Sequence, residues 1–378
     1  MRATTALIAL AACATSLVAQ APKRLPIISG AMGINVLVEV DGTVKSWGAP
    51  SADGGFYGDG TDNTDTRKVP TPIPGVHDII GAAVGYDHAL LLSADGSVLG
   101  WGRNNGCALA LPDDRRRYAP VRIPGVRGVM QVAASQYFSA AVLADGSVRV
   151  WGTNEGGLLA NGKAGSDADC ANTPVAVEGL TGVTHIAVSN DHVLALKDDG
   201  TVWGWGSNTN GELCDGTTEQ RNRPVQMKGI SNAVDIDIGA ASVIVLSDGT
   251  VRMCGKNGDG ALADAPKNVK HTTPFKVGGI AGAVAARTSA GATMVRLRDG
   301  SLLGWGNGMF GSVGDGFIDK VNPKPHPPIG LGPVLVHYYA SNSGYGIRAD
   351  GTVMAWGIYV GGPKEWQLTP IPFFKVKL

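Results

Sequence analysis

The chain has 378 residues, and its 32 lysine and arginine side chains are balanced by 32 aspartate and glutamate side chains. A neutral chain lacks the basic surface that nucleic-acid binding needs, so we expect no nucleic-acid partner. Glycine is abundant, at 55 residues, which suits many tight turns, and no long stretch has apolar residues at helical spacing. These features argue against a helical protein and predict a chain of short strands.

Residues 1–21 have the pattern of a secretory signal peptide. One arginine precedes an apolar run, and Ala19-Gln20-Ala21 places small residues where signal peptidase cleaves. Alternatively, Leu10-Ala11-Ala12-Cys13 resembles a bacterial lipobox, with Cys13 as the lipidated residue. We therefore expect a bacterial protein that is exported to the periplasm or the medium, with an envelope lipoprotein as the alternative. No other apolar segment is long enough to span a bilayer.

Seven Asp-Gly pairs recur about every fifty residues along the rest of the chain. Each is followed by Ser or Thr, then by Val or Leu, and six positions after the Asp comes Trp or Cys, always before a Gly. Asp-Gly between apolar runs is typical of a two-residue hairpin in which both residues take positive φ. The pairs begin at Asp41, Asp95, Asp145, Asp199, Asp248, Asp299 and Asp350, and the later residues are Trp47, Trp101, Trp151, Trp205, Cys254, Trp305 and Trp356.

Each repeat has room for roughly four short strands. The runs before the Asp-Gly pairs are nearly continuous in apolar character, which indicates strands buried on both faces. Each repeat ends in Pro and a short apolar segment, and Pro fits the edge of a sheet. Seven such sheets bury their faces only when arranged radially. We predict an all-β protein, a seven-bladed β-propeller of residues 22–378 with about four antiparallel strands per blade. We expect a monomer, with its ring closed by the N- and C-terminal strands.

Four cysteines remain after Cys13, and an even number in an exported chain permits two disulfides. Their spacing leaves the three possible pairings open. If a bridge forms, we favour Cys170 with a loop cysteine of a neighbouring repeat, either Cys107 or Cys214. Cys254 stands where other repeats have Trp, so we expect a buried free thiol there.

Two segments carry a recognisable pattern: GYDHALLLSADGSVLGWGRNNGCAL at residues 85–109 and SNDHVLALKDDGTVWGWGSNTNGEL at residues 189–213. This pattern resembles the regulator of chromosome condensation repeat, and the resemblance extends over essentially the whole mature chain. It implies the propeller fold more firmly than any activity. Members of the family include a nucleotide-exchange factor for a nuclear GTPase. A secreted bacterial propeller that inhibits β-lactamase is a more distant likeness, in architecture and export.

No catalytic motif is present: the chain has no G-x-S-x-G elbow, no H-E-x-x-H and no phosphate-binding loop. We therefore assign no catalytic residue, no metal ligand and no cofactor. Loops that contain Asp59, Asp62, Asp65, Asp167, Asp169, Asp259 and Asp264 either bind calcium or form polar turns, and we favour turns.

Eight residues are candidates for binding. His88 and His192 occupy the same position in their repeats, and we expect them to hydrogen-bond backbone near the channel. The aromatic residues of the loops either anchor a partner or fill gaps between blades. They are Phe56, Tyr57, Tyr86, Tyr137, Phe138 and Phe310.

Three functions remain open. The leading hypothesis is an exported, non-catalytic scaffold that binds another protein through loops on one face. The alternative is a hydrolase or lyase that acts on glycan or peptide at the channel mouth, which requires converging carboxylates in a pocket. Guanine-nucleotide exchange, by family analogy, comes last.

Overall fold

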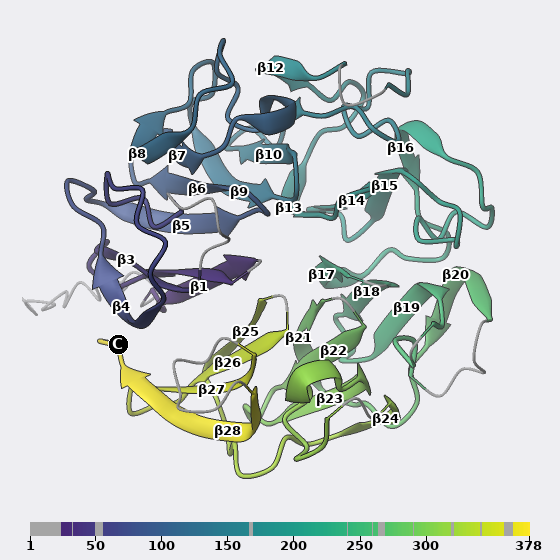
Figure 1. The fold of residues 1–378 in the computed structure, drawn as a ribbon. Helices are drawn as coiled ribbons and strands as arrows, with labels where there is room; N and C mark the ends of the chain where they lie inside the picture. The colour runs from purple at the N-terminus through teal and green to yellow at the C-terminus, as the bar shows by residue number, and fades with distance from the viewer. Residues whose placement is uncertain are drawn as a thin grey trace, which may run out of the picture.

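The computed structural model describes residues 24–31, 33–49, 56–165, 169–239, 241–258, 260–263, 269–289, 291–318, 321–340, 342–358 and 366–378. Seven antiparallel sheets of four strands each are arranged radially around a central channel (Figure 1). The predicted seven-bladed β-propeller is confirmed. The predicted signal peptide and the lipobox at Cys13 lie outside the described residues, as do Asp167, Asp259 and Asp264.

Each blade is a continuous stretch of chain, and its strands run in sequence order from the channel outward. Blades 1 to 3 contain β1 (Ile27–Ala31), β2 (Ile34–Val38), β3 (Val44–Gly48) and β4 (Arg67–Pro72); β5 (Ile79–Val84), β6 (His88–Ser93), β7 (Val98–Gly102) and β8 (Arg117–Arg122); and β9 (Val129–Ala134), β10 (Phe138–Leu143), β11 (Val148–Gly152) and β12 (Ala171–Ala176).

Blades 4 to 7 continue around the ring (Figure 1). They contain β13 (Val183–Val188), β14 (His192–Lys197), β15 (Val202–Gly206) and β16 (Arg221–Gln226); β17 (Ala233–Ile238), β18 (Ala241–Leu246), β19 (Val251–Lys256) and β20 (Lys270–Lys276); β21 (Ala283–Thr288), β22 (Ala292–Leu297), β23 (Leu302–Asn307) and β24 (Val321–His326); and β25 (Val336–Ala340), β26 (Ser343–Ile347), β27 (Thr352–Ile358) and β28 (Trp366–Lys375).

Helical structure in the described residues is limited to two short 3₁₀ turns, η1 (Asn105–Cys107) and η2 (Met309–Gly311). Both lie in loops between the third and fourth strands of a blade. No helix within the described ranges has the length and apolar character needed to cross a membrane.

The Asp-Gly pairs join the second and third strands of every blade, as predicted, but the turn type differs from the prediction. Only the glycine of each pair has positive φ, as at Gly42 (+82°), and its N–H donates to the carbonyl three residues earlier. This geometry is a type I turn followed by a bulge glycine. The Asp side chain explains the choice, because in each turn it accepts the N–H of the Ser or Thr two residues later, as at Asp41 and Thr43 (3.0 Å). Such an Asx turn holds the Asp at negative φ.

The repeated Trp sits at the junction between its own blade and the preceding one. Trp205 of blade 4, for example, is fully buried among blade 3 residues that include Phe138 and Leu158. Its indole N–H donates to the Leu158 carbonyl (2.8 Å). The same bond recurs at Trp101, Trp151, Trp305 and Trp356, each with a loop carbonyl of the preceding blade. The conserved spacing of the repeat therefore fixes how adjacent blades pack.

A disulfide replaces this packing between blades 4 and 5. Cys254 pairs with Cys214, and their Cα atoms are 5.8 Å apart. The expectation of a buried free thiol at Cys254 is wrong. Where other blades place an indole, Cys254 places a sulfur atom, and it reaches the loop position that holds a small residue, such as Ala160, elsewhere.

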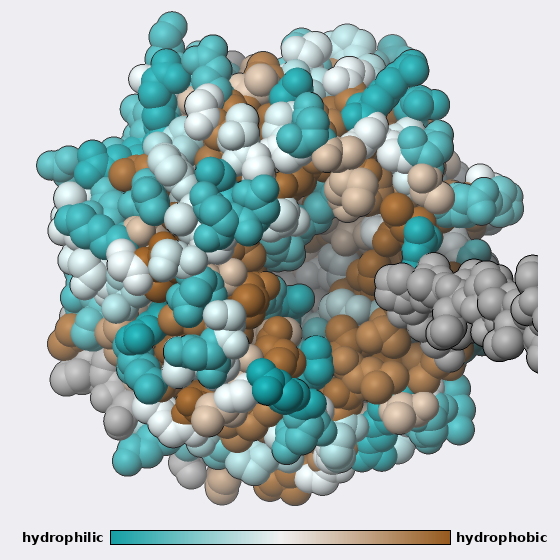
Figure 2. Space-filling model, turned by 180° about the vertical axis from the view of Figure 1, so that it is seen from behind, coloured by the Kyte–Doolittle hydropathy of each residue, from teal (hydrophilic) through white to brown (hydrophobic). Residues whose placement is uncertain are grey.

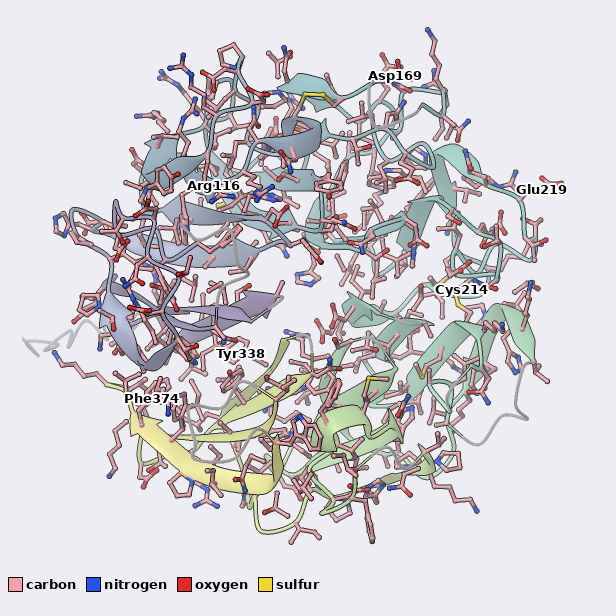
Figure 3. The ribbon with its side chains drawn as sticks, in the orientation of Figure 1. Arg116, Asp169, Cys214, Glu219, Tyr338 and Phe374 are labelled. Atoms are coloured by element: carbon pink, nitrogen blue, oxygen red, sulfur yellow. A yellow bond between two sulfur atoms is a disulfide. The ribbon has the colours of Figure 1, made fainter. Side chains whose placement is uncertain are left out.

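The second disulfide joins Cys107 of blade 2 to Cys170 of blade 3, and its Cα atoms are also 5.8 Å apart. This is one of the two pairings favoured from the sequence. Each disulfide therefore connects neighbouring blades. Figure 3 shows Cys214 between blades 4 and 5, away from the centre of the ring.

The outermost strand of each blade leaves an unpaired edge, and each carries proline. Pro120 of β8 and Pro174 of β12 occupy the same position as the prolines of the other five outer strands. Proline cannot donate a hydrogen bond to an added strand, so it discourages edge-to-edge association.

The ends of the chain meet, as expected, at the junction of blades 1 and 7. No strand is exchanged: β1 and β28 belong to different sheets, and side-chain packing closes the ring. Trp47 of blade 1 packs edge-on against Tyr345 of blade 7, with ring centroids 5.8 Å apart. The Tyr338 hydroxyl also donates to the Pro26 carbonyl (2.6 Å).

Candidate functional site

The central channel is a cavity with a volume of about 920 Å³. It is lined by the innermost strand of every blade. Seen from the face opposite to Figure 1, it opens as a hollow in the middle of the ring, with hydrophobic residues gathered along part of its rim (Figure 2). The hydrolase hypothesis requires paired carboxylates in such a cavity.

Two carboxylates, Asp235 and Asp237, do lie on the same face of the inner strand β17. Asp235 Oδ2 accepts the Ala286 N–H (2.8 Å) and Asp237 Oδ2 accepts the Thr288 N–H (2.8 Å), both from the inner strand of blade 6. Asp235 also pairs with Arg287 (2.9 Å). Both acids therefore hold one blade to the next.

Uncharged side chains do the same elsewhere in the channel. Ser29 of blade 1 accepts the Val84 N–H of blade 2 (3.0 Å). Gln131 of blade 3 accepts the Ile186 N–H of blade 4 (2.9 Å) and donates to its carbonyl (3.0 Å). The inner strand of a blade exposes unpaired backbone groups to the channel, and these side chains satisfy them. This shared role accounts for the acids without catalysis.

The two candidate histidines are buried and bridge neighbouring blades. His88 Nε2 lies 2.8 Å from Ser139 Oγ, which in turn donates to the Ala108 carbonyl (2.9 Å). Burial lowers the pKa of His88 to about 4, so its imidazole is neutral at physiological pH. His192 Nδ1 lies 2.8 Å from the carboxylate of Asp191, and its Nε2 lies 3.5 Å from Ser242 Oγ of blade 5. Both side chains bond mainly to neighbouring side chains rather than to backbone near the channel.

The six candidate aromatic residues divide into two groups. Phe56, Tyr57 and Phe138 are buried. The Tyr57 hydroxyl donates to the Gly48 carbonyl of its own blade (2.8 Å), and Phe138 packs with Trp205 of the next blade, so these side chains belong to the core. Tyr86 is 41% exposed, whereas Tyr137 and Phe310 are half-buried. Only these three present surface to a partner.

Phe310 belongs to a larger apolar patch that the sequence did not reveal. Its ring lies against Trp366 of blade 7, with centroids 5.8 Å apart. Met309 (40% exposed), Phe317 (51%) and Trp366 (39%) lie on the same loops and strand end. The loop is held there because the Gly316 N–H donates to the Leu368 carbonyl (3.0 Å). We call Met309, Phe310, Phe317 and Trp366 the blade 6–7 patch.

The backbone at Phe310 is unusual. Its φ is +55°, in the left-handed region that a bulky side chain rarely adopts. Blades 2 and 3 have glycine five residues after their repeat Trp, at Gly106 (φ +56°) and Gly156 (φ +62°). Blade 6 has Phe310 at that position. An aromatic side chain is thus held on the surface at a backbone cost of about 1–2 kcal/mol.

Comparison with known proteins identifies the repeat. Models of the regulator of chromosome condensation (RCC1) repeat match residues 95–142, 145–196 and 199–246, and a second model of the same repeat matches residues 79–107 and 183–212. The matched residues span blades 2 to 5.

Curated relatives are longer than this chain. The human E3 ubiquitin-protein ligase HERC2 is 29% identical over 53% of this chain, which spans 4% of that protein. The ultraviolet-B receptor UVR8 of Arabidopsis thaliana is 27% identical over 80% of this chain, which spans 60% of that protein.

Solved structures match in fold. Human WBSCR16 has a TM-score of 0.73 and 20% identity, covering 84% of this chain and 85% of that one. Prp20p of Saccharomyces cerevisiae, described with its binding to Gsp1p and histones, has a TM-score of 0.75 and 22% identity, covering 92% and 86%.

Proposed function

Because this chain belongs to the regulator of chromosome condensation repeat family, we propose that it is an exported protein-binding scaffold that presents the blade 6–7 patch to its partner. The observation that carries the proposal is Phe310, an aromatic side chain on a strained surface loop where blades 2 and 3 have glycine. Backbone strain of this kind persists at sites where function requires it. Exposed Trp, Phe and Met side chains are also the residue types enriched in protein interfaces.

The neighbours in fold support binding of a protein partner. Prp20p is described with its binding to Gsp1p and histones, and the same yeast protein is described bound to Kap60. At 21–22% identity these likenesses extend to the fold alone, so the partners themselves are not carried over. We propose for this chain only the manner of binding, in which a rigid propeller holds loops of several blades in one fixed surface.

Two observations support export. The first 21 residues have the pattern of a signal peptide, and the two disulfides are of a kind that persists in oxidising compartments. The test is the N-terminal sequence of the protein recovered from periplasm or medium. A chain that begins at residue 22 supports export, and an intact chain in the cytosol contradicts it.

Binding is tested by affinity capture with residues 22–378 immobilised. The wild type is compared with the double variant Phe310→Gly/Trp366→Ala, using envelope and secreted fractions of the source organism. The matched control is Met130→Ala/Val234→Ala, which removes exposed apolar side chains from the inner strands of blades 3 and 5. We expect one protein to be retained by the wild type and the control and lost by the patch variant. Equal retention by all three would contradict the proposal.

A further inference from the structure

One part of the central channel, with a volume of about 220 Å³, is lined by the inner strands of blades 1 to 6, and we call this part the recess. By the same measure of volume one water needs about 10–15 Å³, so the recess has room for a small organic molecule. Its polar lining comes from Ser29, Gln131, His185, Asp237 and Arg287.

The recess is asymmetric because one register position carries very different side chains around the ring. The position is defined from the repeat Trp or Cys, which pairs with a residue of the second strand of its blade. The next residue of that second strand pairs with the inner-strand residue that we compare. Blades 2, 3 and 4 have Ala83, Ala133 and Ala187 there, whereas blades 5 and 6 have Asp237 and Arg287. Small side chains thus leave open space that faces two opposite charges.

Asp237 and Arg287 both take part in joining blade 5 to blade 6, but other blades are joined without charge. Ser29 and Gln131 satisfy the neighbouring inner strand with neutral groups. Charges inside the channel carry a desolvation cost, and burial raises the pKa of Asp237 to about 6. Neutral side chains fill the same structural role at lower cost, which leaves the charges available for a second role.

Both charged side chains retain hydrogen-bonding capacity toward the recess. Asp237 uses Oδ2 for the Thr288 N–H. Arg287 directs Nη1 to Asp235 and to the Ala286 carbonyl. Besides the Thr288 bond, the Asp237 carboxylate accepts only the N–H of Ile238, the next residue in its own strand, and in the described residues the Nε and Nη2 groups of Arg287 make no hydrogen bond. An acceptor anion and a fork of donors therefore line the same small recess.

We propose that this recess binds a small zwitterion of amino-acid type, with its ammonium group on Asp237 and its carboxylate on Arg287. A guanidinium fork matches a carboxylate in geometry as well as charge, and a carboxylate is a strong acceptor for an ammonium. The alanine side of the recess accommodates the ligand's side chain. This site is separate from the blade 6–7 patch and does not depend on the proposed function.

The test is isothermal titration calorimetry on the intact mature protein with L-alanine, L-leucine, L-glutamate, L-lysine and L-phenylalanine, each alone. Any amino acid that binds is then compared with its N-acetyl and methyl ester derivatives, which remove the ammonium and the carboxylate charge respectively. Each derivative should bind roughly tenfold more weakly or worse, the loss expected for one charge-assisted contact.

Asp237→Asn is the decisive variant, because its amide oxygen can still accept the Thr288 N–H and the blades stay joined. It should lose roughly tenfold or more in affinity. The control Asp145→Asn makes the same chemical change in a surface turn outside the recess and should retain wild-type affinity. The proposal is overturned if none of the five amino acids binds up to 10 mM, if an N-acetyl derivative binds as tightly as its parent, or if Asp237→Asn binds as the wild type does.

Discussion

At the scale of single residues, Phe310 has a side chain that its backbone conformation does not favour. Its backbone has the left-handed conformation that Gly106 and Gly156 adopt in sibling blades. Its ring lies on Trp366 and is half-exposed. A residue chosen only for stability at this position would be glycine, as in those blades.

Replacing Phe310 by glycine should therefore release strain while removing an anchor. We expect Phe310→Gly to change the free energy of unfolding by less than about 1 kcal/mol, since relief of strain offsets the lost packing on Trp366. Gly156→Ala calibrates the strain, because its Cβ would meet no atom closer than 3.4 Å, and it should destabilise by about 1 kcal/mol. Urea unfolding measures both. A loss of more than about 3 kcal/mol in Phe310→Gly would mean that Phe310 is a core residue.

Asp237 predicts a distinct pH dependence. Its pKa is raised to about 6 in the folded protein from an ordinary value of 3.8, so the folded state binds the proton more tightly than the unfolded state. Its contribution to stability is therefore most favourable below about pH 4 and is lost as the pH rises through 6. Arg287, which faces Asp237, opposes the shift, and Asp235 adds to it.

Comparison with Asp237→Asn isolates this contribution from the other acids. The surface Asp residues of the seven turns have lowered pKa values and favour the opposite trend, but they are common to both proteins. Between pH 7 and pH 4 the wild type should gain about 1–2 kcal/mol of unfolding free energy relative to the variant. Parallel pH profiles from chemical denaturation would contradict this.

At the scale of elements, the turn between the second and third strands depends more on glycine than on aspartate. A Cβ at Gly146 would lie 2.8 Å from the Gly182 Cα, and φ there is +75°. The Asp145 side chain contributes two exposed hydrogen bonds to Ser147. We expect Gly146→Ala to lower the free energy of unfolding by about 2–3 kcal/mol and Asp145→Ala by about 1 kcal/mol. The reverse order in denaturant titrations would contradict this account of the turn.

The junction of blades 4 and 5 tests whether a disulfide and a buried Trp are equivalent ways to join adjacent blades. The double variant Cys214→Ala/Cys254→Trp recreates the small residue and Trp that other junctions use. This double variant should fold. Because its blade 4–5 junction has no disulfide, reductant should not lower the stability that this junction provides. Cys214→Ala alone removes the bridge, and for a 40-residue separation this should cost about 4 kcal/mol. Thermal unfolding with and without reductant measures both, and a double variant no more stable than the single one would contradict the assigned equivalence.

At the scale of the whole molecule, the repeat was enough to predict seven blades, four strands in each and the meeting of the chain ends. These features follow from patterns of local sequence: Asp-Gly turns, buried apolar strands and edge prolines. The turn type was predicted incorrectly because the Asp side chain bonds two residues ahead and keeps its own φ negative. The free thiol at Cys254 was predicted incorrectly because the repeat aligns Cys254 with Trp. That alignment does not indicate its disulfide partner, which lies in the preceding blade.

The candidate sites were harder to predict, because they depend on contacts between distant residues. Trp366 meets Phe310 only across two blades, and no local pattern links them. A partial signal for Phe310 was present, however, since alignment of the repeats places it opposite Gly106 and Gly156 of blades 2 and 3. Asp237 and Arg287 likewise occupy one register position in successive blades, where blades 1 to 4 have serine or alanine and blade 7 has Tyr338.

Site-specific photo-crosslinking in the source organism tests the claim of a protein-binding scaffold most directly. A photoreactive residue is placed at Met309 in the blade 6–7 patch and, as the control, at Val69, which is 65% exposed on the outer strand of blade 1. The account predicts one discrete adduct with another protein from position 309 and none from position 69. No adduct from position 309, or equal adducts from both positions, would contradict it.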